Sequence, residues 1–465
     1  MSSLRGPSAL IALAIASVSA VLAPMPATNE AVAAERTNVV LILADDMNDY
    51  DLDYMPLTRQ LLGAQGTEFT DFLSPHPLCC PARAELLTGQ YAHNNGVHDN
   101  GGEYGQRGLR DGANNVGRWL RKAGYRTAIV GKFLNGFGPA MTRSLPGWNV
   151  FNIATRCVLC SHGTTYWNDG RPITSDQYTT NYVRDRTVDY IRRFSGRGFP
   201  FFIHANVVAP HNMKPGRDVR ALGPPIPAPR DSGTMTHIPA PFVDKPSFNE
   251  GDVSDKPSHW QRAFVDRSTM VSQFHRRIES LQAVDRMVRA IVRALSATGQ
   301  LDNTAIIFTS DNGYLLGEHR LDKKNFPYEE DIQAPLLVRG PGVPAGASVE
   351  ETMSLVDIPA TIAEFAGATP ERMQDGRSML PVIAGALGYE TSLIQAGSAA
   401  GPWSWRGVRD GNWTYVEHVS GERELYDRTS DPFQLENVYG TKPVVEVRLQ
   451  AELERLKTCA GTVCQ

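Results

Sequence analysis

The chain has 465 residues, of which 42% are hydrophobic and 21% are charged. This composition is typical of a folded globular protein, and the length suffices for one large α/β domain and a smaller one. The formal net charge of -4 argues against binding to nucleic acid or to an anionic membrane surface, because both partners favour a basic chain.

The first predicted segment is a signal peptide over residues 1–34. Arg5 precedes an apolar run from Ala9 to Ala23, which is too short for a membrane span and ends at Pro24. A retained membrane anchor is the alternative. No later segment is apolar enough to cross a bilayer, so we expect the mature chain to be secreted or extracytoplasmic.

Apolar runs predict strands that are buried on both faces of a sheet, at residues 38–44, 127–130, 200–208, 304–309 and 335–338. Helical patterns occupy residues 56–64, 82–90, 115–123, 177–194 and 267–296, and the last pattern carries its arginines on the outer face. This alternation predicts an α/β fold with a mixed, mostly parallel sheet flanked by helices.

Two later segments depart from this pattern. Residues 211–260 hold nine prolines and no periodicity, and a loop of this length inside a compact domain is usually functional or mobile. Residues 403–418 alternate like a β-hairpin with Asp410-Gly411 at its turn, and a helix is predicted at 444–457. We therefore expect a main domain of residues 35–391 and a small antiparallel subdomain with a helix at 392–465.

The six cysteines fall in three local pairs. Export would favour disulfides within Cys157-x2-Cys160 and within Cys459-x4-Cys464, and a four-cysteine zinc site is the alternative. Adjacent cysteines rarely bridge each other, because the geometry is strained. The pair Cys79-Cys80 therefore has no evident structural role.

Polar side chains follow four of the predicted strands, at the edge where a parallel sheet binds its ligands. They are Asp45 and Asp46, Lys132, His211, and Asp311 with Asn312. Each has a plain structural alternative, such as a turn cap for the aspartates or a surface position for the lysine and histidine. A ligand-binding site is indicated because all of these residues are expected at the same edge of the sheet.

The type of these side chains indicates the chemistry. Three carboxylates and an amide oxygen suit Ca²⁺ or Mg²⁺ better than zinc, which prefers His and Cys. Arg83, Lys132 and a helix start at residues 81–87 add positive charge and free N–H groups, which attract anions. The sequence therefore predicts a pocket for a tetrahedral oxyanion, phosphate or sulfate.

The stretch PLCCPARAELLTGQYAHNNGV resembles the signature of the type I sulfatase family, whose core is Cys-x-Pro-x-Arg. The resemblance continues through LILADDM, AGYRTAIVGKFLNG, TSDNGYLLGEHRL, PYEEDIQAPLLVRGPG and ELYDRTSDPFQLENV, and so covers nearly all of the mature chain. It implies an alkaline-phosphatase-like fold and hydrolysis of sulfate esters. It also implies that Cys79 is oxidised to formylglycine by a formylglycine-generating enzyme.

The same resemblance assigns roles to single residues. It makes Asp45, Asp46, Asp311 and Asn312 metal ligands, with Cys79 as nucleophile and further metal contact. Arg83 would steady the formylglycine hydrate, and Lys132, His211 and Lys324 would hold the sulfate and help the leaving oxygen depart. Lys324 is preferred to Lys323 from its distance to Tyr328, and Ca²⁺ is preferred to Mg²⁺.

One departure from the family pattern bears on the substrate. Many relatives have a His two residues after the matching Lys, and here that position is Leu134, followed by Asn135. This form resembles the N-acetylglucosamine-6-sulfatase branch, which implies a sulfated sugar such as N-acetylglucosamine 6-sulfate, with aryl sulfates as further substrates. A phosphate or phosphonate ester hydrolase and a catalytically silent carbohydrate-binding relative are the alternatives.

Overall fold

The structure, a computed structural model, describes residues 1, 2, 6, 36–138, 145–398 and 400–465. Residues 36–465 form one compact unit. The predicted signal peptide lies almost entirely outside the described residues. Among the helices that are described, none is long and apolar enough to cross a membrane.

A ten-stranded mixed sheet forms the centre of the described part of the chain, in the order β13-β2-β12-β9-β1-β8-β4-β5-β6-β7. Its parallel centre consists of β9 (Thr304–Ser310), β1 (Asn38–Asp45), β8 (Phe201–Pro210), β4 (Arg126–Gly131) and β5 (Val150–Arg156). The other members are β2 (Thr67–Phe69), β6 (Thr164–Asn168), β7 (Arg171–Ser175), β12 (Leu336–Arg339) and β13 (Ala347–Val349). The predicted fold class is confirmed, and all five predicted strands belong to this sheet.

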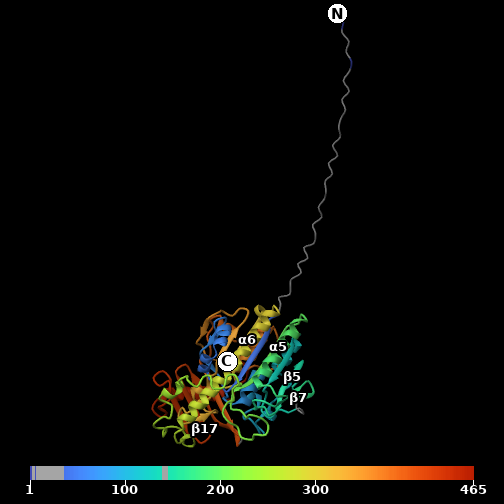
Figure 1. The fold of residues 1–465 in the computed structure, drawn as a ribbon. Coiled ribbons are helices and arrows are strands. Elements are labelled where there is room, and N and C mark those ends of the chain that lie inside the picture. The colour runs from blue at the N-terminus through green and yellow to red at the C-terminus, as the bar shows by residue number, and fades with distance from the viewer. Residues whose placement is uncertain (3–5, 7–35, 139–144, 399) are drawn as a thin grey trace. The chain divides into compact units, whose positions relative to one another are not determined.

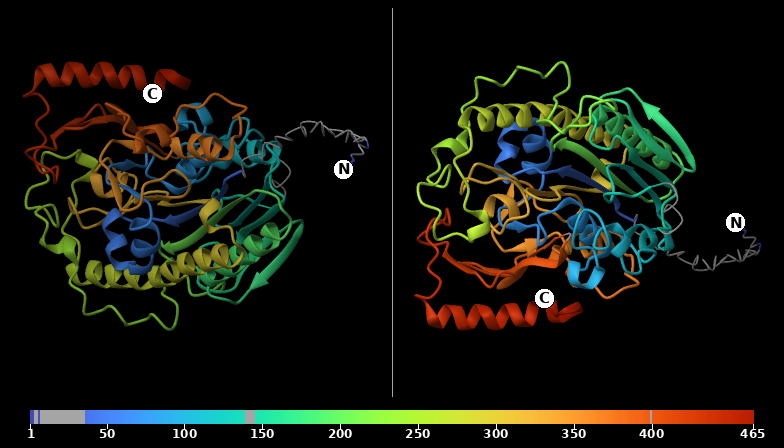
Figure 2. Two further views of the ribbon diagram at one scale, coloured as in Figure 1. Left: turned by 90° about the horizontal axis from the view of Figure 1, so that it is seen from above. Right: turned by 90° about the horizontal axis from the view of Figure 1, so that it is seen from below.

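Helices cover both faces of the sheet because the strands are apolar on both sides. In β1, Val39, Leu41 and Leu43 join one hydrophobic cluster, whereas Val40 and Ile42 join another. The first cluster is covered by α2 (Cys79–Thr88), α4 (Val116–Lys122) and α8 (Asp357–Ala366), and the second by α5 (Thr179–Ser195) and α6 (Arg267–Ala297). Figure 1 shows α5 and α6 side by side, and Figure 2 shows helices above and below the sheet.

Shorter elements connect these layers. The helical ones are η1 (Asp49–Tyr54), α1 (Pro56–Thr58), η2 (Arg59–Gly63), α3 (Ala92–Asn95), η3 (Gln106–Gly108), η5 (Pro241–Asp244), η6 (Ser258–Trp260), η7 (Leu301–Asn303), α7 (Glu329–Ile332), α9 (Leu380–Ile383) and η8 (Gly461–Cys464). The short strands are β3 (Phe72–Leu73), β10 (Leu315–Leu316), β11 (Asp322–Lys323) and β14 (Met353–Ser354). The helix predicted at 56–64 is thus α1 followed by a single π-helical turn.

One prediction for α6 is wrong. The sequence pattern predicts the arginines of this helix on its outer face, but Arg277 is 1% exposed. Its Nη2 donates to Asp51 Oδ2 at 2.9 Å and to the backbone oxygen of Asp46 at 2.5 Å. A buried carboxylate and a carbonyl at the end of β1 therefore draw this side chain inward.

The Pro-rich segment 211–260 packs against the domain through its aromatic residues. Phe242 in η5 is fully buried beside Phe274 of α6, and Trp260 in η6 contacts Phe326 and Tyr328. The segment lacks long helices and strands, as its prolines predict, yet it contributes to four hydrophobic clusters.

The C-terminal part is an antiparallel sheet of β15 (Thr391–Ser398), β16 (Gly401–Asp410), β17 (Trp413–His418) and β18 (Arg423–Asp427), followed by α10 (Pro443–Leu456). The hairpin turn is Gly411-Asn412, one residue later than predicted, because Asp410 still pairs with Thr391. The sheet shares hydrophobic clusters with the preceding chain, and α10 lies on its outer side (Figure 2).

The four cysteines outside the adjacent pair form two disulfides, Cys157–Cys160 and Cys459–Cys464. The alternative of a four-cysteine zinc site is therefore wrong. Cys79 and Cys80 are both free thiols and both buried.

Candidate active site

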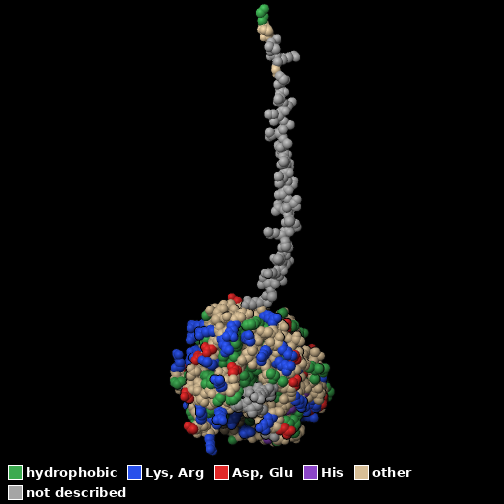
Figure 3. Space-filling model, turned by 90° about the vertical axis from the view of Figure 1, so that its right-hand side faces the viewer, with side chains coloured by type: hydrophobic (Ala, Val, Ile, Leu, Met, Phe, Trp, Pro, Cys, Tyr) green, Lys and Arg blue, Asp and Glu red, His purple; other side chains and the backbone are tan. Residues whose placement is uncertain are grey.

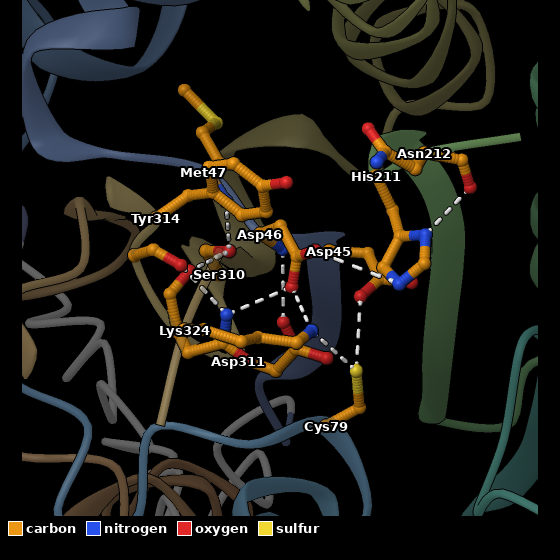
Figure 4. Close-up of polar contacts among 12 residues, drawn as sticks. Asp45, Asp46, Met47, Cys79, His211, Asn212, Ser310, Asp311, Tyr314 and Lys324 are labelled. Carbon is orange, nitrogen blue, oxygen red and sulfur yellow. Dashed lines mark hydrogen bonds and ion pairs between the residues drawn. The ribbon is translucent and has the colours of Figure 1, made fainter. Parts of the chain in front are cut away.

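The polar residues that follow the central strands gather at one edge of the sheet (Figure 4). Strand β1 ends at Asp45 and leads to Asp46, β9 leads to Asp311 and Asn312, β8 leads to His211 and β4 leads to Lys132. The first turns of α2 add Cys79 and Arg83, and the loop after β11 adds Lys324. All are buried apart from small exposed parts of His211 and Lys324, whose side chains are each 11% exposed.

Both backbone polar groups of Asp46, its N–H and its carbonyl, form hydrogen bonds. Its φ is +65°, in the left-handed region that Asp tolerates better than most residues. The backbone N–H of Asp46 donates to Asp311 Oδ1 at 3.1 Å, and its carbonyl accepts from Arg277. These contacts keep the Asp46 carboxylate turned toward the cluster.

Cys79 begins α2 with its sulfur among the charged groups. Its Sγ lies 3.5 Å from Asp45 Oδ1 and 2.8 Å from Lys324 Nζ. Burial, partly offset by Lys132 and Lys324, raises the pKa of the Cys79 thiol to about 12. An unmodified Cys79 is therefore protonated at neutral pH and is a poor nucleophile.

Cys80 has different surroundings. It belongs to the hydrophobic cluster beneath α2, and its backbone N–H donates to Asn100 Oδ1 at 2.9 Å. Burial raises the pKa of its thiol to about 12 as well. Only Cys79 presents its sulfur to the polar cluster.

Each carboxylate of the cluster has a cationic partner. Lys132 contacts Asp45, Lys324 contacts Asp46, and Arg83 Nε donates to Asp311 Oδ2 at 2.8 Å. Burial alone would raise the pKa of Asp45 and Asp46, but these cations hold both values below the usual range. The three carboxylates and three cations therefore carry opposite and equal formal charge.

His211 is oriented by its own neighbour. Its Nδ1 lies 2.6 Å from the backbone oxygen of Asn212, so Nδ1 carries the proton, and Nε2 lies 3.5 Å from Asp46 Oδ2. Burial lowers the pKa of His211, although Asp46 opposes this shift. A neutral Nε2 and a carboxylate face each other as two acceptors, which is favourable only with a proton or a cation between them.

The cluster has the composition of a metal site. The donor atoms of Asp45, Asp46, Cys79 and His211 lie within 4.8 Å of one another. Asn312 Nδ2 donates to Asp46 Oδ1 at 2.8 Å, while its Oδ1 is buried and has no hydrogen-bond partner among the residues that the structure describes. Rotating this amide by half a turn would point Oδ1 toward Asp46, where the oxygen could coordinate a cation.

The structure brings all nine predicted site residues together and adds others. Lys324 reaches the cluster, whereas the Lys323 side chain is 67% exposed and pairs with Asp322. Sequence reasoning missed Arg277 and Asn206, whose Oδ1 accepts from Arg83 Nη1 at 3.3 Å. Asn206 had one signal, since it is a polar residue in the apolar run of β8.

The departure from the family pattern at Leu134-Asn135 has a clear structural setting. Leu134 is 4% exposed and packs in the hydrophobic cluster beneath α2, so this position supplies no polar group to the site. Asn135 follows it with Oδ1 buried and without a partner among the described residues.

Comparisons with known proteins agree with this geometry. The family model described as Sulfatase matches residues 37–368, and a second one, described as N-sulphoglucosamine sulphohydrolase, C-terminal, matches residues 317–459. An arylsulfatase of Chlamydomonas reinhardtii is 30% identical over 97% of this chain and 79% of its own length. The N-acetylglucosamine-6-sulfatase of Homo sapiens is 28% identical over 92% of this chain and 86% of its own.

The fold is also found in solved structures. BT4656, solved in complex with its substrate D-glucosamine-2-N,6-O-disulfate, superposes with a TM-score of 0.75 at 22% identity, covering 91% of this chain and 97% of that one. The sheet and its helical layers are those of the alkaline-phosphatase-like fold. Together with the match over residues 37–368, these likenesses show that the chain belongs to the sulfatase family and is a sulfatase enzyme.

Proposed function

We propose that this sulfatase removes sulfate from sugars, with a terminal 6-sulfated N-acetylglucosamine as its substrate. We further propose that Cys79 acts after oxidation to formylglycine and that one Ca²⁺ is bound beside it, with Mg²⁺ as second choice. The observation that carries the proposal is the position of Cys79, whose Sγ lies between Asp45 and Lys324 at the first turn of α2.

The residues present suit a hard divalent cation. Asp45, Asp46, Asp311 and Asn312 would hold it through oxygen atoms, the ligands that Ca²⁺ and Mg²⁺ prefer. Because the cluster without a metal has balanced formal charge, a divalent ion would leave it with two positive charges. Such a site attracts an anionic ester and stabilises negative charge on the sulfate oxygens.

Formylglycine explains how a buried cysteine position could serve as nucleophile, since its hydrate supplies a hydroxyl oxygen in place of a protonated thiol. Arg83 supports this position by holding Asp311 through Nε and the backbone oxygen of Lys132 through Nη1 at 3.1 Å. The host would need a formylglycine-generating enzyme to make this change.

The remaining cations fit the task of holding the ester. Lys132 and Lys324 carry ammonium groups beside Asp45 and Asp46, within reach of a sulfate bound between them. His211 keeps one proton on Nδ1 through the Asn212 carbonyl, so Nε2 is the atom that would take up a proton and pass it to the leaving oxygen.

The substrate assignment is supported by the resemblance around Leu134-Asn135 and by the likeness to the human N-acetylglucosamine-6-sulfatase. The substrate bound to BT4656 also carries a 6-O-sulfate on glucosamine. The pocket rim is built from loops, which differ most among relatives, so the test must compare several sugars.

The test is turnover of a panel of sulfated sugars, an aryl sulfate and an aryl phosphate by the purified enzyme. We expect release of sulfate from N-acetylglucosamine 6-sulfate to exceed release from 2-, 3- or 4-sulfated isomers. Activity on aryl sulfates with none on any sulfated sugar would contradict the substrate. Preference for the aryl phosphate would instead favour the phosphoester alternative.

The modification is tested on the same protein. Replacing a thiol by an aldehyde makes the Cys79 peptide about 18 Da lighter, which mass spectrometry reads directly. An active enzyme whose Cys79 peptide has the mass of unmodified cysteine would refute the formylglycine proposal.

A further inference from the structure

A cavity of about 400 Å³ lies between the loop after β5 and the segment after His211. Its walls are the loop closed by the Cys157–Cys160 disulfide and the chain at Lys214–Arg217. The two walls are joined, because Lys214 N donates to Leu159 O and Ser161 N donates to Lys214 O, both at 2.8 Å. We call this cavity the basic pocket.

The charges of the basic pocket are all positive. Arg156, Lys214 and Arg217 line it, and the described residues of its wall include no Asp or Glu. Within the described part of the chain, none of the three forms an ion pair, and Arg217 Nε donates to the backbone oxygen of Gly163 at 2.7 Å. Three cations that line one hollow, with no carboxylate among the described residues of its wall, favour an anionic ligand.

The basic pocket lies at the same edge of the sheet as the active site. Strands β1, β8, β4 and β5 are parallel, and Arg156 is the last residue of β5. With strands spaced about 4.8 Å apart, the end of β5 is about 10 Å from that of β8 and about 14 Å from that of β1. Lys214 follows His211 by three residues, a reach of at most about 11 Å.

Lys132 lies between the two sites, since β4 separates β8 from β5 in the sheet. A saccharide with its ester at Cys79 could therefore extend past Lys132 along the edge of the sheet toward Arg156. The distance is that of a neighbouring sugar rather than of another substituent on the same ring.

A second arginine-rich groove provides a contrast. It lies between α5 and α6, has a volume of about 620 Å³, and is lined by Arg184, Arg186, Arg192 and Arg293. However, Asp185 and Asp189 also line it, and they pair with Arg184 at 2.8 Å and Arg186 at 2.9 Å. Figure 3 shows the side of the molecule that faces right in Figure 1, where Lys and Arg are likewise mixed with Asp and Glu.

We propose that the basic pocket binds an anionic group, sulfate or carboxylate, on the sugar next to the one that loses its sulfate. This inference rests on the proposed function, because it assumes a saccharide substrate. It defines the substrate class further, as an oligosaccharide with negative charge on at least two adjacent sugars. The disulfide keeps the Arg156 side of the pocket in place before the substrate arrives.

The test uses the enzyme with both Lys214→Gln and Arg217→Gln. Its substrates are a 6-sulfated monosaccharide and three disaccharides, in which the second sugar is neutral, carries a carboxylate or carries a sulfate. We expect kcat/KM to fall at least about ten-fold on one or both anionic disaccharides, mainly through KM, because charged hydrogen bonds are lost. The monosaccharide and the neutral disaccharide should be unaffected.

The matched control carries Arg192→Gln and Arg293→Gln, which remove the same charge from the groove between α5 and α6. This control should leave kcat/KM unchanged on the monosaccharide and on all three disaccharides. Equal losses on every substrate, an equal effect of the control, or no loss on either anionic disaccharide would overturn the proposal. A loss on only one of these identifies the anionic group as sulfate or carboxylate.

A binding experiment tests the basic pocket separately from the proposed function. If the enzyme cleaves none of the saccharides, affinity for the anionic disaccharides is measured by calorimetry on Cys79→Ala, with and without the two pocket substitutions. A Kd weakened about ten-fold by these substitutions supports the basic pocket, and an unchanged Kd or the absence of binding overturns it.

Discussion

At the scale of single residues, the two adjacent cysteines show how position outweighs chemical identity. Both thiols are buried and have a raised pKa of about 12. The sulfur of Cys79 contacts Lys324 and Asp45, whereas Cys80 packs among apolar side chains. The sequence motif points to the same member, since Cys79 stands two residues before Pro81 and four before Arg83.

We predict that Cys79→Ala lowers kcat by at least about a thousand-fold, because the nucleophile is removed. Cys80→Ala should keep most of its activity and lose on the order of 1 kcal/mol of unfolding free energy through poorer packing. Each variant is the control for the other, with sulfate release and urea unfolding as measurements. An inactive Cys80→Ala beside an active Cys79→Ala would place the nucleophile one residue later.

The acidic residues lead to a prediction about metal removal. A chelator should abolish sulfate release, and Ca²⁺ should restore it, because the oxygen donors of Asp45, Asp46 and Asn312 suit a hard cation. Added Ca²⁺ should also raise the melting temperature, since a ligand bound to the folded state stabilises it. Restoration by Zn²⁺ alone, with Ca²⁺ inert in both assays, would contradict this assignment.

At the scale of elements, strands β1, β4, β8, β9 and β12 could be predicted because burial on both faces leaves a continuous apolar run. Strands β5 and β6 could not, because polar residues such as Asn152 and Thr164 interrupt them, and neither could β7, which is exposed over Arg171–Thr174. The burial of the Arg277 side chain could not be predicted from the sequence either. Its partner Asp51 is 226 residues away in sequence, and a periodic pattern around an arginine normally indicates a solvent-facing position.

Arg277 of helix α6 contacts Asp46, so its replacement should affect both stability and the active site. Arg277→Met should lower the unfolding free energy by about 3–5 kcal/mol, because the buried Asp51 loses its partner. It should also lower kcat, because the carbonyl of Asp46 loses the contact that holds the left-handed backbone. Chemical unfolding and steady-state kinetics measure the two effects.

Two further variants separate stability from positioning. Arg276→Met changes the exposed neighbour and should alter neither measurement. Adding Asp51→Asn to Arg277→Met removes the unpaired buried charge, so part of the stability should return while kcat stays low. Full recovery of kcat in this double variant would show that Arg277 acts on stability alone.

At the scale of the whole molecule, the site was predictable as a set of residues because parallel strands bring their carboxyl ends to one edge. The pairing within the set was not predictable. Whether Asp311 binds Arg83 or another cation depends on how α2 packs against β9, and nothing in the local sequence fixes that. The basic pocket joins residues 156 and 217 from separate segments, so it too needs the fold.

The stability of the whole fold should depend on pH in part through His204, which lies in the central sheet. His204 in β8 is 4% exposed, and neither ring nitrogen has a hydrogen-bond partner in the described residues. Burial, together with the positive charge of Arg83, lowers the pKa of His204 from 6.5 to about 3. The folded protein therefore keeps this side chain neutral over the range in which the unfolded chain protonates it.

Since the unfolded state binds the additional proton between pH 6.5 and 3, the contribution of His204 is present above pH 6.5 and is lost as the pH falls. At pH 5 the loss should be about 2 kcal/mol relative to neutral pH. His204→Leu cannot be protonated, so its unfolding free energy should fall by about that much less between pH 7 and pH 5. Urea unfolding at both pH values measures the difference, with the half-exposed His259→Leu as control. Identical pH dependence of His204→Leu and the parent enzyme would show that His204 does not govern acid unfolding.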